Sequence, residues 1–319
     1  MIDAENYKLA EGDILFARTG ASVGKSYIYK DSDGLVYYAG FLIRARIKEK
    51  YNAEFVFQNT LTDKYNKYIT VTSQRSGQPG VNAQEYSKFK IQIPNKKEQT
   101  KIGQYFSQLD HLITLHQREC DQLKELKKTM LKKMFPRDDS NIPEVRFAGF
   151  TDDWEQRKLG EIVGIYDGVH QTPKYQDSGI MFLSVENIST LQSTKYISEE
   201  DFKRDYKVYP QENDILMTRI GDVGTTNVVT DNTLKAYYVS LALLKYKNTN
   251  PYFLSNAMQS NYVQKGLANR TLKTAVPMKI NKDEIGKVDV ILTAAVEEQS
   301  KIGSYFKNLD NLITLHQRL

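Results

Sequence analysis

An internal repeat constrains this chain more than any other feature of its sequence. Residues 101–118 recur at residues 301–318, and fourteen of the eighteen aligned positions are identical. The Glu-Gln pair at positions 98–99 recurs as well, at positions 298–299. Solenoid proteins repeat every ~20–50 residues, so an offset of 200 residues excludes that class. The sequence instead indicates two copies of one unit, each a globular part followed by the near-identical segment.

The near-identical segment has the apolar period of a long helix. In the first copy the pattern starts near residue 98 and ends at Pro136, and at about 1.5 Å per residue it spans about 55 Å. A helix this long with one apolar stripe needs a partner, so we predict that the two copies pair antiparallel and hold the globular parts apart. The alternative is that each helix lies only on its own globular part. The stripe comprises Ile102, Phe106, Leu109, Ile113, His116, Cys120, Leu123, Leu126, Met130 and Met134 in the first copy and Ile302, Phe306, Leu309, Ile313 and His316 in the second.

The globular parts are predicted to be α/β units with short strands. A weaker match between residues 12–20 and residues 213–221 indicates that these parts are also related. The second copy has more residues ahead of its helix than the first, so we expect the first unit to lack its N-terminal portion. Strands are predicted at residues 13–17, 35–48, 214–218 and 236–246, and helices at residues 55–68 and 251–265.

Composition excludes several classes of protein. The chain has 319 residues, of which 40% are hydrophobic and 26% charged, so it can bury a core. Cys120 is the only cysteine, which excludes a disulfide framework and fits a small core residue in a cytoplasmic protein. No stretch has the length and apolarity of a membrane span, and no signal-peptide pattern is present. The net charge of +5 permits a polyanionic partner.

Two segments resemble enzyme motifs but do not match them. Residues 20–26 are one residue short of a Gly-x4-Gly-Lys-Ser phosphate loop, so we interpret them as a tight turn and not as an ATP site centred on Lys25. Residues 250–253, Asn-Pro-Tyr-Phe, lack the second proline of the adenine methyltransferase signature and are interpreted as the start of a helix. His116 and His316 lie in the helical stripe and are interpreted as packing residues. No carboxylate cluster has the spacing of a metal site, and the four histidines leave little for a histidine-based one.

Loops after the predicted strands carry basic and amide side chains among glycines. Arg, Lys, Gln and Asn are donors that reach phosphates and base edges, so each copy is predicted to present a DNA-binding surface. Two such surfaces in one chain would read two half-sites. The alternative, from another class, is a helical scaffold that bridges proteins without reading DNA. The candidate DNA contacts are Arg18, Lys25, Arg75 and Gln78 in the first copy and His170, Gln171, Lys174, Arg219, Arg270 and Lys273 in the second.

Several of these segments carry a resemblance to a known family. They are the Glu-Gln-x-Lys-Ile-Gly elements at residues 98–103 and 298–303, the Asp-Ile-Leu elements at residues 13–15 and 214–216, and residues 168–175. Over nearly its whole length the chain resembles the specificity subunit of type I restriction–modification enzymes. The resemblance implies an α+β fold with two α/β target recognition domains separated by long helices that pack as an antiparallel coiled coil. The implied domains are an N-terminally incomplete recognition domain at 1–95, a spacer helix at 96–136, a linker and second recognition domain at 137–295, and a spacer helix at 296–319.

The resemblance also implies what the chain does. It implies a non-catalytic subunit that binds double-stranded DNA, reads a bipartite target, and directs adenine methylation and restriction by partner subunits. S-adenosylmethionine, ATP and magnesium would then belong to the modification and restriction subunits, and this chain would hold no cofactor. The coiled coil would double as the surface on which the modification subunits dock. Its implied contact residues are Ile102, Phe106, Leu109, Ile113, Leu123, Met130, Ile302, Phe306, Leu309 and Ile313.

Two features depart from the family pattern. The first recognition domain has no equivalent of the Trp-x4-Leu-Gly opening that the second carries at residues 154–160. The second spacer helix also ends at Leu319, earlier in the repeat than the first. A fragment, a split or permuted form, and a variant that restores its missing half by dimerising all fit these departures, and in the last case a second copy of the chain is an expected partner.

Overall fold

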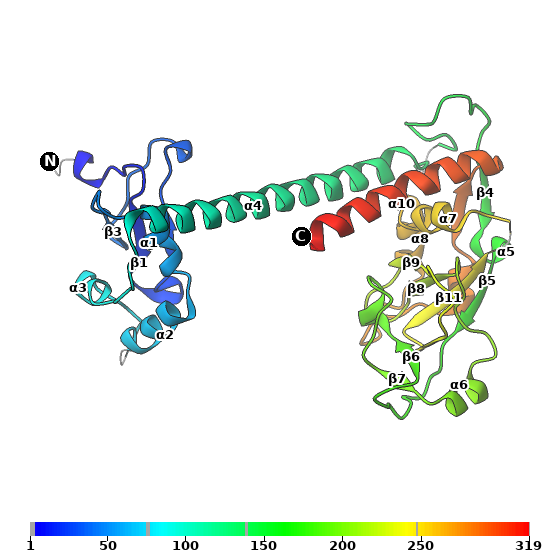
Figure 1. The fold of residues 1–319 in the computed structure, drawn as a ribbon. Coiled ribbons are helices and arrows are strands. Elements are labelled where there is room, and N and C mark those ends of the chain that lie inside the picture. Colours follow the sequence, from blue (N-terminus) through cyan, green and yellow to red (C-terminus); the bar gives the residue numbers. More distant parts are fainter. Residues whose placement is uncertain (1–3, 75–76, 138–139, 247, 319) are drawn as a thin grey trace. The chain divides into compact units, whose positions relative to one another are not determined.

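The chain forms two compact units (Figure 1). A computed structural model describes every residue except 1–3, 75–76, 138–139, 247 and 319. Unit 1 is Met1–His116 and unit 2 is Gln117–Leu319, and the boundary falls within the long helix α4 (Lys96–Lys133). Both units mix helices with strands, which confirms the predicted α+β class. Within the described ranges, no helix combines the length and apolarity needed to cross a membrane.

Unit 1 is a small antiparallel sheet covered by helices. Its strand order is β2-β1-β3, so β1 lies in the middle. Ile14 and Phe16 of β1 pack against Tyr65 and Ile69 of α2, because alternate residues of a strand point to one face. The unit contains β1 (Ile14–Ala17), β2 (Ser26–Ile28), β3 (Leu42–Ala45), α1 (Ala53–Asn59), α2 (Asp63–Thr72), α3 (Ala83–Ser87) and the 3-10 turns η1 (Ala4–Tyr7), η2 (Gly20–Ser22) and η3 (Asp31–Asp33).

The described residues of unit 2 form three sheets. A four-stranded sheet has the order β5-β11-β8-β9, a three-stranded sheet the order β10-β6-β7, and β12 pairs with β4. The strands are β4 (Glu155–Lys158), β5 (Val163–Asp167), β6 (Ile180–Leu183), β7 (Tyr196–Ile197), β8 (Ile215–Thr218), β9 (Thr226–Val228), β10 (Lys235–Tyr237), β11 (Leu241–Tyr246) and β12 (Asp289–Leu292). The helices are α5 (Leu159–Ile162), η4 (Val185–Asn187), α6 (Glu199–Asp205), α7 (Pro251–Met258), α8 (Asn261–Arg270), α9 (Lys282–Gly286) and α10 (Val296–Arg318).

Two apolar cores hold unit 2 together. In the first, α7 lies between α10 on one side and strands β9 and β12 on the other. Trp154, 1% exposed, sits in this core with its ring centroid 5.5 Å from that of Phe253. The second core fills the space between the β10-β6-β7 sheet and β11 and includes Phe182 and Leu243.

The predicted helices and strands lie at the predicted positions, but several that were predicted as one element are shorter or are divided into two. The strand predicted at 35–48 is confined to β3, and the one predicted at 236–246 is two strands, β10 and β11, in different sheets. The helix predicted at 55–68 is broken between α1 and α2, where the Thr62 hydroxyl accepts a hydrogen bond from the Tyr65 N–H at 3.3 Å. Ser260 caps α8 and breaks the helix predicted at 251–265 in the same way. Hydroxyl caps explain both breaks, because they start a new helix within an apolar-periodic run.

The repeated Glu-Gln-x-Lys-Ile-Gly element anchors each long helix to its own globular part. In unit 1, the Gln99 side-chain oxygen accepts a hydrogen bond from the Asn52 N–H at 3.0 Å, at the start of α1. In unit 2, Gln299 accepts one from the Asn250 N–H at 2.9 Å, at the start of α7. Asn250 caps α7, which confirms that residues 250–253 start a helix.

The glycine of this element is required by a close approach. A Cβ at Gly103 would lie 2.4 Å from Asn52 Oδ1, and a Cβ at Gly303 would lie 2.5 Å from Asn250 Oδ1. Both distances are far below van der Waals contact, so any side chain would push the long helix away from the short one. Glycine therefore recurs in both copies because the two helices touch there.

The repeated Asp-Ile-Leu element also has a structural role. Asp13 is buried, and its Oδ2 accepts a hydrogen bond from the Ala10 N–H at 2.9 Å, while Asp214 Oδ2 accepts one from the Gln211 N–H at 2.8 Å. Each carboxylate thus closes the turn before its strand. Burial raises the pKa of Asp13, but the hydrogen bonds from Arg46 and from the Ala10 N–H, together with the positive charges of Arg46 and Arg44, lower that pKa overall.

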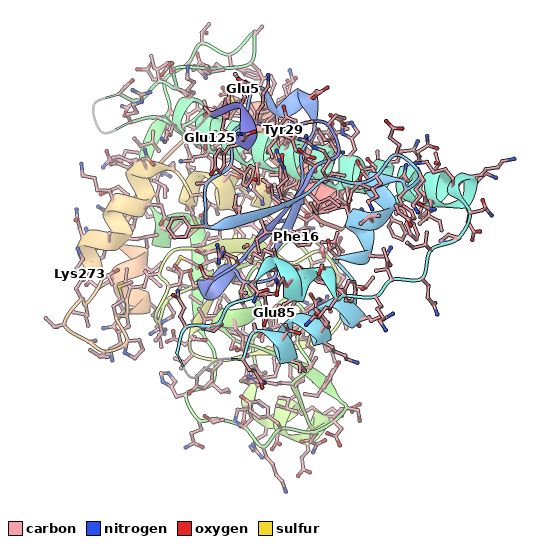
Figure 2. The ribbon with its side chains drawn as sticks, turned by 90° about the vertical axis from the view of Figure 1, so that its left-hand side faces the viewer. Glu5, Phe16, Tyr29, Glu85, Glu125 and Lys273 are labelled. Carbon is pink, nitrogen blue, oxygen red and sulfur yellow. The ribbon has the colours of Figure 1, made fainter. Side chains whose placement is uncertain are left out.

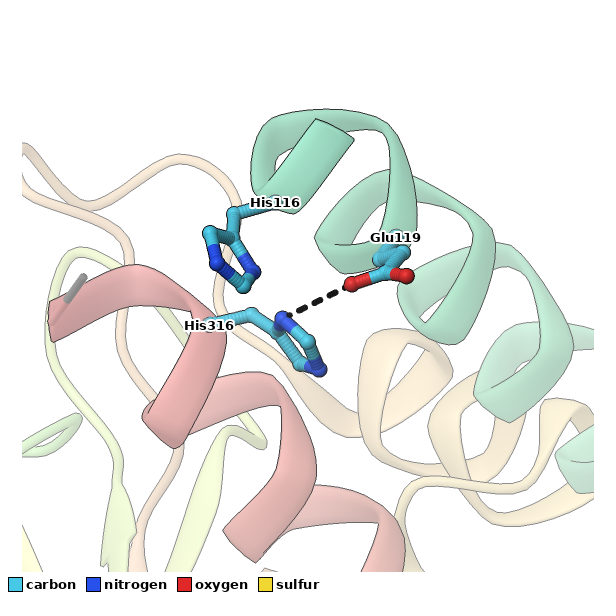
Figure 3. A group of neighbouring side chains, drawn as sticks. All are labelled: His116, Glu119 and His316. Atoms are coloured by element: carbon cyan, nitrogen blue, oxygen red, sulfur yellow. Dashed lines mark ion pairs between the residues drawn. The ribbon is translucent and has the colours of Figure 1, made fainter. Parts of the chain in front are cut away.

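The second half of α4 packs antiparallel against α10 within unit 2. Lys127 Nζ lies 2.6 Å from Asp310 Oδ1, and His316 Nδ1 lies 3.3 Å from Glu119 Oε2 (Figure 3). As residue numbers rise along α4, those of their partners fall along α10. Cys120, 1% exposed, packs in this contact as the predicted core residue. The antiparallel helix pair predicted from the repeat is therefore present in unit 2.

Candidate DNA interface

In unit 1 the fold brings together two of the loops that the sequence singled out. The first follows β1 and includes the turn of residues 20–26, and the second follows α2. The Gly20 N–H donates to the Pro79 carbonyl at 3.1 Å, and the Val81 N–H donates to the Arg18 carbonyl at 2.8 Å. These bonds place Arg18 and Gln78 on adjacent segments, with the Gln78 amide nitrogen 3.1 Å from where a Cβ at Gly20 would lie.

Unit 2 repeats the same arrangement with different side chains. The Gly221 N–H donates to the Met278 carbonyl at 2.8 Å, and the Ile280 N–H donates to the Arg219 carbonyl at 3.0 Å. The loop after α8 therefore lies against the turn after β8, just as the loop after α2 lies against the turn after β1. Lys273 projects from this loop and is exposed (Figure 2). The two units thus present one loop pair twice.

The turn of residues 20–26 has the geometry of a β-turn connection and not of a phosphate loop. It joins β1 to β2, and its Gly20 and Gly24 have φ values of +75° and +84°, in the left-handed region. A Cβ at Gly24 would lie 2.4 Å from Ile69 Cγ2, so this glycine also allows α2 to pack closely. The interpretation as a tight turn is confirmed.

A third loop joins this surface in unit 2. Residues 168–175 follow β5, and the Val239 N–H donates to the Val169 carbonyl at 2.9 Å. This bond holds the loop beside the segment between β10 and β11, whose Ser240 carbonyl accepts from the Arg219 N–H at 2.9 Å. His170, Gln171 and Lys174 are all exposed on this loop. The structure therefore collects candidates from three separate sequence segments of unit 2.

Arg219 differs from the other candidates because it is buried. Its side chain is 7% exposed, and its guanidinium forms an ion pair with the Asp167 carboxylate at the end of β5. Burial lowers the pKa of Arg219, and its Nε has no hydrogen-bond partner among the described residues. An arginine held in this way positions the 168–175 loop and is not free to reach a phosphate.

Arg18, the counterpart of Arg219 in unit 1, is exposed. Its Nη1 lies 3.3 Å from the Gly40 carbonyl, and unit 1 has no described residue in the place of Asp167. The same repeat position is therefore a surface cation in one unit and a buried one in the other. Nothing in the sequence at positions 18 and 219 distinguishes them, because the difference lies in β5.

The remaining candidates divide by their partners. Lys25, Lys174 and Lys273 are exposed, and in the part of the chain that the structure describes none of them has a carboxylate within ion-pair distance. Arg270 is half-buried, and its Nη1 lies 3.3 Å from Glu284 Oε2 beside a recess of about 410 Å³. Arg75 lies outside the described residues.

Two residues on the same surface of unit 2 were not predicted from the sequence. Lys279 is exposed and bridges both Ile220 and Leu272, so it lies between the two loops of unit 2. Val276, at the tip of the loop after α8, is 99% exposed, and an apolar side chain in that position is available for contact with a ligand. Lys279 could have been found from its place at the end of the basic loop, whereas nothing marked Val276.

Comparisons with known proteins identify the family of this chain. The family model described as the type I restriction modification DNA specificity domain matches residues 1–125 and 151–319. The type I restriction enzyme MjaVIII specificity subunit of Methanocaldococcus jannaschii is 22% identical, over 97% of this chain and 74% of that protein. The putative type I restriction enzyme MjaX specificity subunit of the same organism is 26% identical, over 50% of this chain and 39% of that protein.

Solved structures share the fold. The S subunit of a type I restriction–modification system from M. genitalium matches with a TM-score of 0.71 and 14% identity, over 98% of this chain and 80% of that one. A chain from a study of complex assembly and conformational transition of the type I R-M system matches with a TM-score of 0.53 and 18% identity, over 98% and 77%. At such identities the likeness concerns the fold alone.

Proposed function

Because the chain belongs to the type I restriction modification DNA specificity domain family, we propose that it is the DNA-reading subunit of a type I restriction–modification complex. The subunit is non-catalytic: it selects the sequence that partner subunits methylate at adenine or cleave. The observation that carries the proposal is that the family match covers both copies of the repeat, and both copies present the same pair of loops after a central strand.

Each unit reads one half of a bipartite target in double-stranded DNA. The exposed Lys25 in unit 1 and Lys174 and Lys273 in unit 2 supply phosphate contacts, since lysines without carboxylate partners can replace the counterions of DNA. Gln78, His170 and Gln171 supply hydrogen-bonding groups for base edges, with Arg18 as a further donor. Arg219 supports DNA binding indirectly, because it holds the 168–175 loop in place. Arg270 supports it as a lining residue of the neighbouring recess.

The modification subunits dock on the long helices. On α4 in unit 1, Phe106 is 41% exposed and Ile113 is 60% exposed. These side chains form an apolar surface, and exposed apolar surfaces mark sites of protein–protein contact. With Ile102 and Leu109, these residues form the proposed contact. Leu123, Met130, Ile302, Phe306, Leu309 and Ile313 belong instead to the helix pair of unit 2.

Cofactors belong to the partners in this proposal. The modification subunits bind S-adenosylmethionine, and the restriction subunits use ATP and magnesium. The chain works in the cytoplasm, where its DNA substrate lies.

Methylation mapping tests the proposal. The chain is combined with modification subunits and S-adenosylmethionine, a DNA library is methylated, and modified adenines are located by sequencing. We expect one split motif with a fixed gap of unread base pairs and binding that weakens steeply with salt. A helical scaffold would give neither result. Methylation without sequence preference would contradict the proposal, and so would a complex that binds DNA equally well with and without this chain.

A further inference from the structure

Among the described residues, His116, Glu119 and His316 form a group with the composition of a metal site (Figure 3). His116 and Glu119 lie on α4, and His316 lies on α10. Each side chain offers one ligand atom, and these three atoms lie within 4.8 Å of one another. The group was not predicted from the sequence, because its two histidines lie 200 residues apart in the chain.

The antiparallel packing of two copies of one segment explains why the two histidines lie side by side. Glu119 lies opposite His316, which holds repeat position 116, so the midpoint of the helix pair falls between positions 116 and 119. Lys127 lies opposite Asp310, which holds repeat position 110, and this second pair has its midpoint in the same place. In an antiparallel pair of equal segments, only positions near the midpoint lie close to their own copies. Position 116 is such a position, and it is a histidine in both copies.

The helices hold the backbone of this group in place. His116 and Glu119 are three residues apart on the unbroken helix α4, so they project from the same face of that helix. Next to Glu119, Cys120 Sγ donates to the Ile313 carbonyl at 3.9 Å, which keeps α10 close to α4 beside the group. Ligands carried by packed helices are positioned more precisely than ligands carried by loops.

The chemistry and spacing of the group fit zinc. Two imidazoles and one carboxylate are a common protein ligand set for zinc, with water in the fourth position. Bonds of about 2.0–2.2 Å in tetrahedral geometry place two ligand atoms about 3.4 Å apart. His316 Nδ1 and Glu119 Oε2, at 3.3 Å, already have this spacing, and a rotation of the His116 side chain brings its ring nitrogen to it. Magnesium and calcium prefer oxygen ligands, so the two imidazoles disfavour them.

We propose that His116, Glu119 and His316 bind one zinc ion that clamps α4 to α10. Each histidine contributes one ring nitrogen and Glu119 one carboxylate oxygen. The side chain of His316 is 18% exposed and that of Glu119 is 52% exposed, so an ion in solution can reach both. The role of the ion is structural, because it joins the two helices at the midpoint of the repeat. Zinc binding by these side chains does not depend on DNA reading, so the proposal and the proposed function can fail separately.

Zinc titration of the full chain tests this proposal. The chain is prepared without a histidine tag and freed of metal with a chelator, and a competing zinc-binding dye then measures affinity and stoichiometry. We expect one zinc ion per chain. His116→Ala, His316→Ala and Glu119→Gln should each weaken binding at least about tenfold, since even the loss of a residue that only supports a ligand can have an effect of this size. His111→Ala removes an exposed histidine of the same helix and, as the matched control, should not change the affinity.

Two further measurements separate coordination of the ion from misfolding. Cobalt in place of zinc should give the intense visible absorption of tetrahedral coordination, and His316→Ala should abolish it while circular dichroism shows that the helices are intact. Zinc should also raise the midpoint of thermal unfolding of the native and His111→Ala chains, but not of the His116→Ala chain. The proposal would be overturned by a chain that does not bind zinc, by full affinity in the Glu119→Gln chain, or by equal losses of affinity in the His111 and His316 variants.

Discussion

At the scale of single residues, the two units differ most at the repeated arginine. Arg219 is buried against Asp167, whereas Arg18 is exposed. Removing one partner of a buried pair leaves the other charge without compensation in a low-dielectric surrounding. The same substitution therefore has different consequences in the two copies.

We expect Arg219→Ala to lower the free energy of unfolding of unit 2 by about 2–4 kcal/mol, because Asp167 loses its partner. Arg18→Ala, the matched control, should change the stability of unit 1 by less than about 0.5 kcal/mol. Urea unfolding followed by fluorescence and circular dichroism measures both. Equal losses in the two variants would show that the burial of Arg219 has no energetic consequence.

A second residue-scale prediction concerns acid stability. The hydrogen bond from the buried Lys235 lowers the pKa of Asp231 to about 2 from its usual 3.8. A carboxyl group with a lowered pKa stabilises the fold above pH 3.8, and this contribution is lost as the pH falls through 2. Asp231→Asn should destabilise unit 2 at pH 7 and flatten its loss of stability between pH 4 and 2. Thermal unfolding across this pH range measures the effect, and an unchanged pH profile would exclude the assignment.

At the scale of elements, the long helices use identical residues in different surroundings. Phe306 is fully buried, with its ring centroid 5.9 Å from that of Phe135 near the end of α4. Phe106, at the same repeat position, is 41% exposed. The repeat therefore fixes which residues can form a helix seam, and the surroundings decide which of them do.

Phe306→Ala should cost about 3–5 kcal/mol of unfolding free energy, since it leaves a cavity between α4, α7 and α10. Phe106→Ala should cost less than about 1 kcal/mol in the isolated chain. In the presence of modification subunits, however, Phe106→Ala should weaken assembly, which titration by analytical ultracentrifugation can measure. A Phe106 variant that assembles as tightly as the native chain would remove α4 of unit 1 from the proposed docking surface.

At the scale of the whole molecule, the proposal assigns each unit its own half-site. Gln171→Ala with Lys273→Ala in unit 2 should relax or weaken recognition in one half of the methylated motif and leave the other half unchanged. Gln78→Ala in unit 1 should affect the other half. Methylation mapping with each variant shows which half of the motif has changed. Lys203→Ala is the control, because Lys203 is an exposed residue of α6 that forms an ion pair with Glu199. If either variant altered both halves alike, separate reading by the two units would be excluded.

The sequence by itself determined the two copies, the long helices, the positions of β1 and β8, and the family. It could do so because these features depend on local periodicity and on residues repeated at one offset. Gly103, Gly303, Asp13 and Asp214 were visible as repeated letters, and the structure supplied their reasons. Only the tertiary structure decided the burial of Arg219, the exposure of Phe106 and the proximity of His116 to His316. Each of these depends on what lies opposite a residue, and contacts between segments distant in the chain leave no local pattern in either segment.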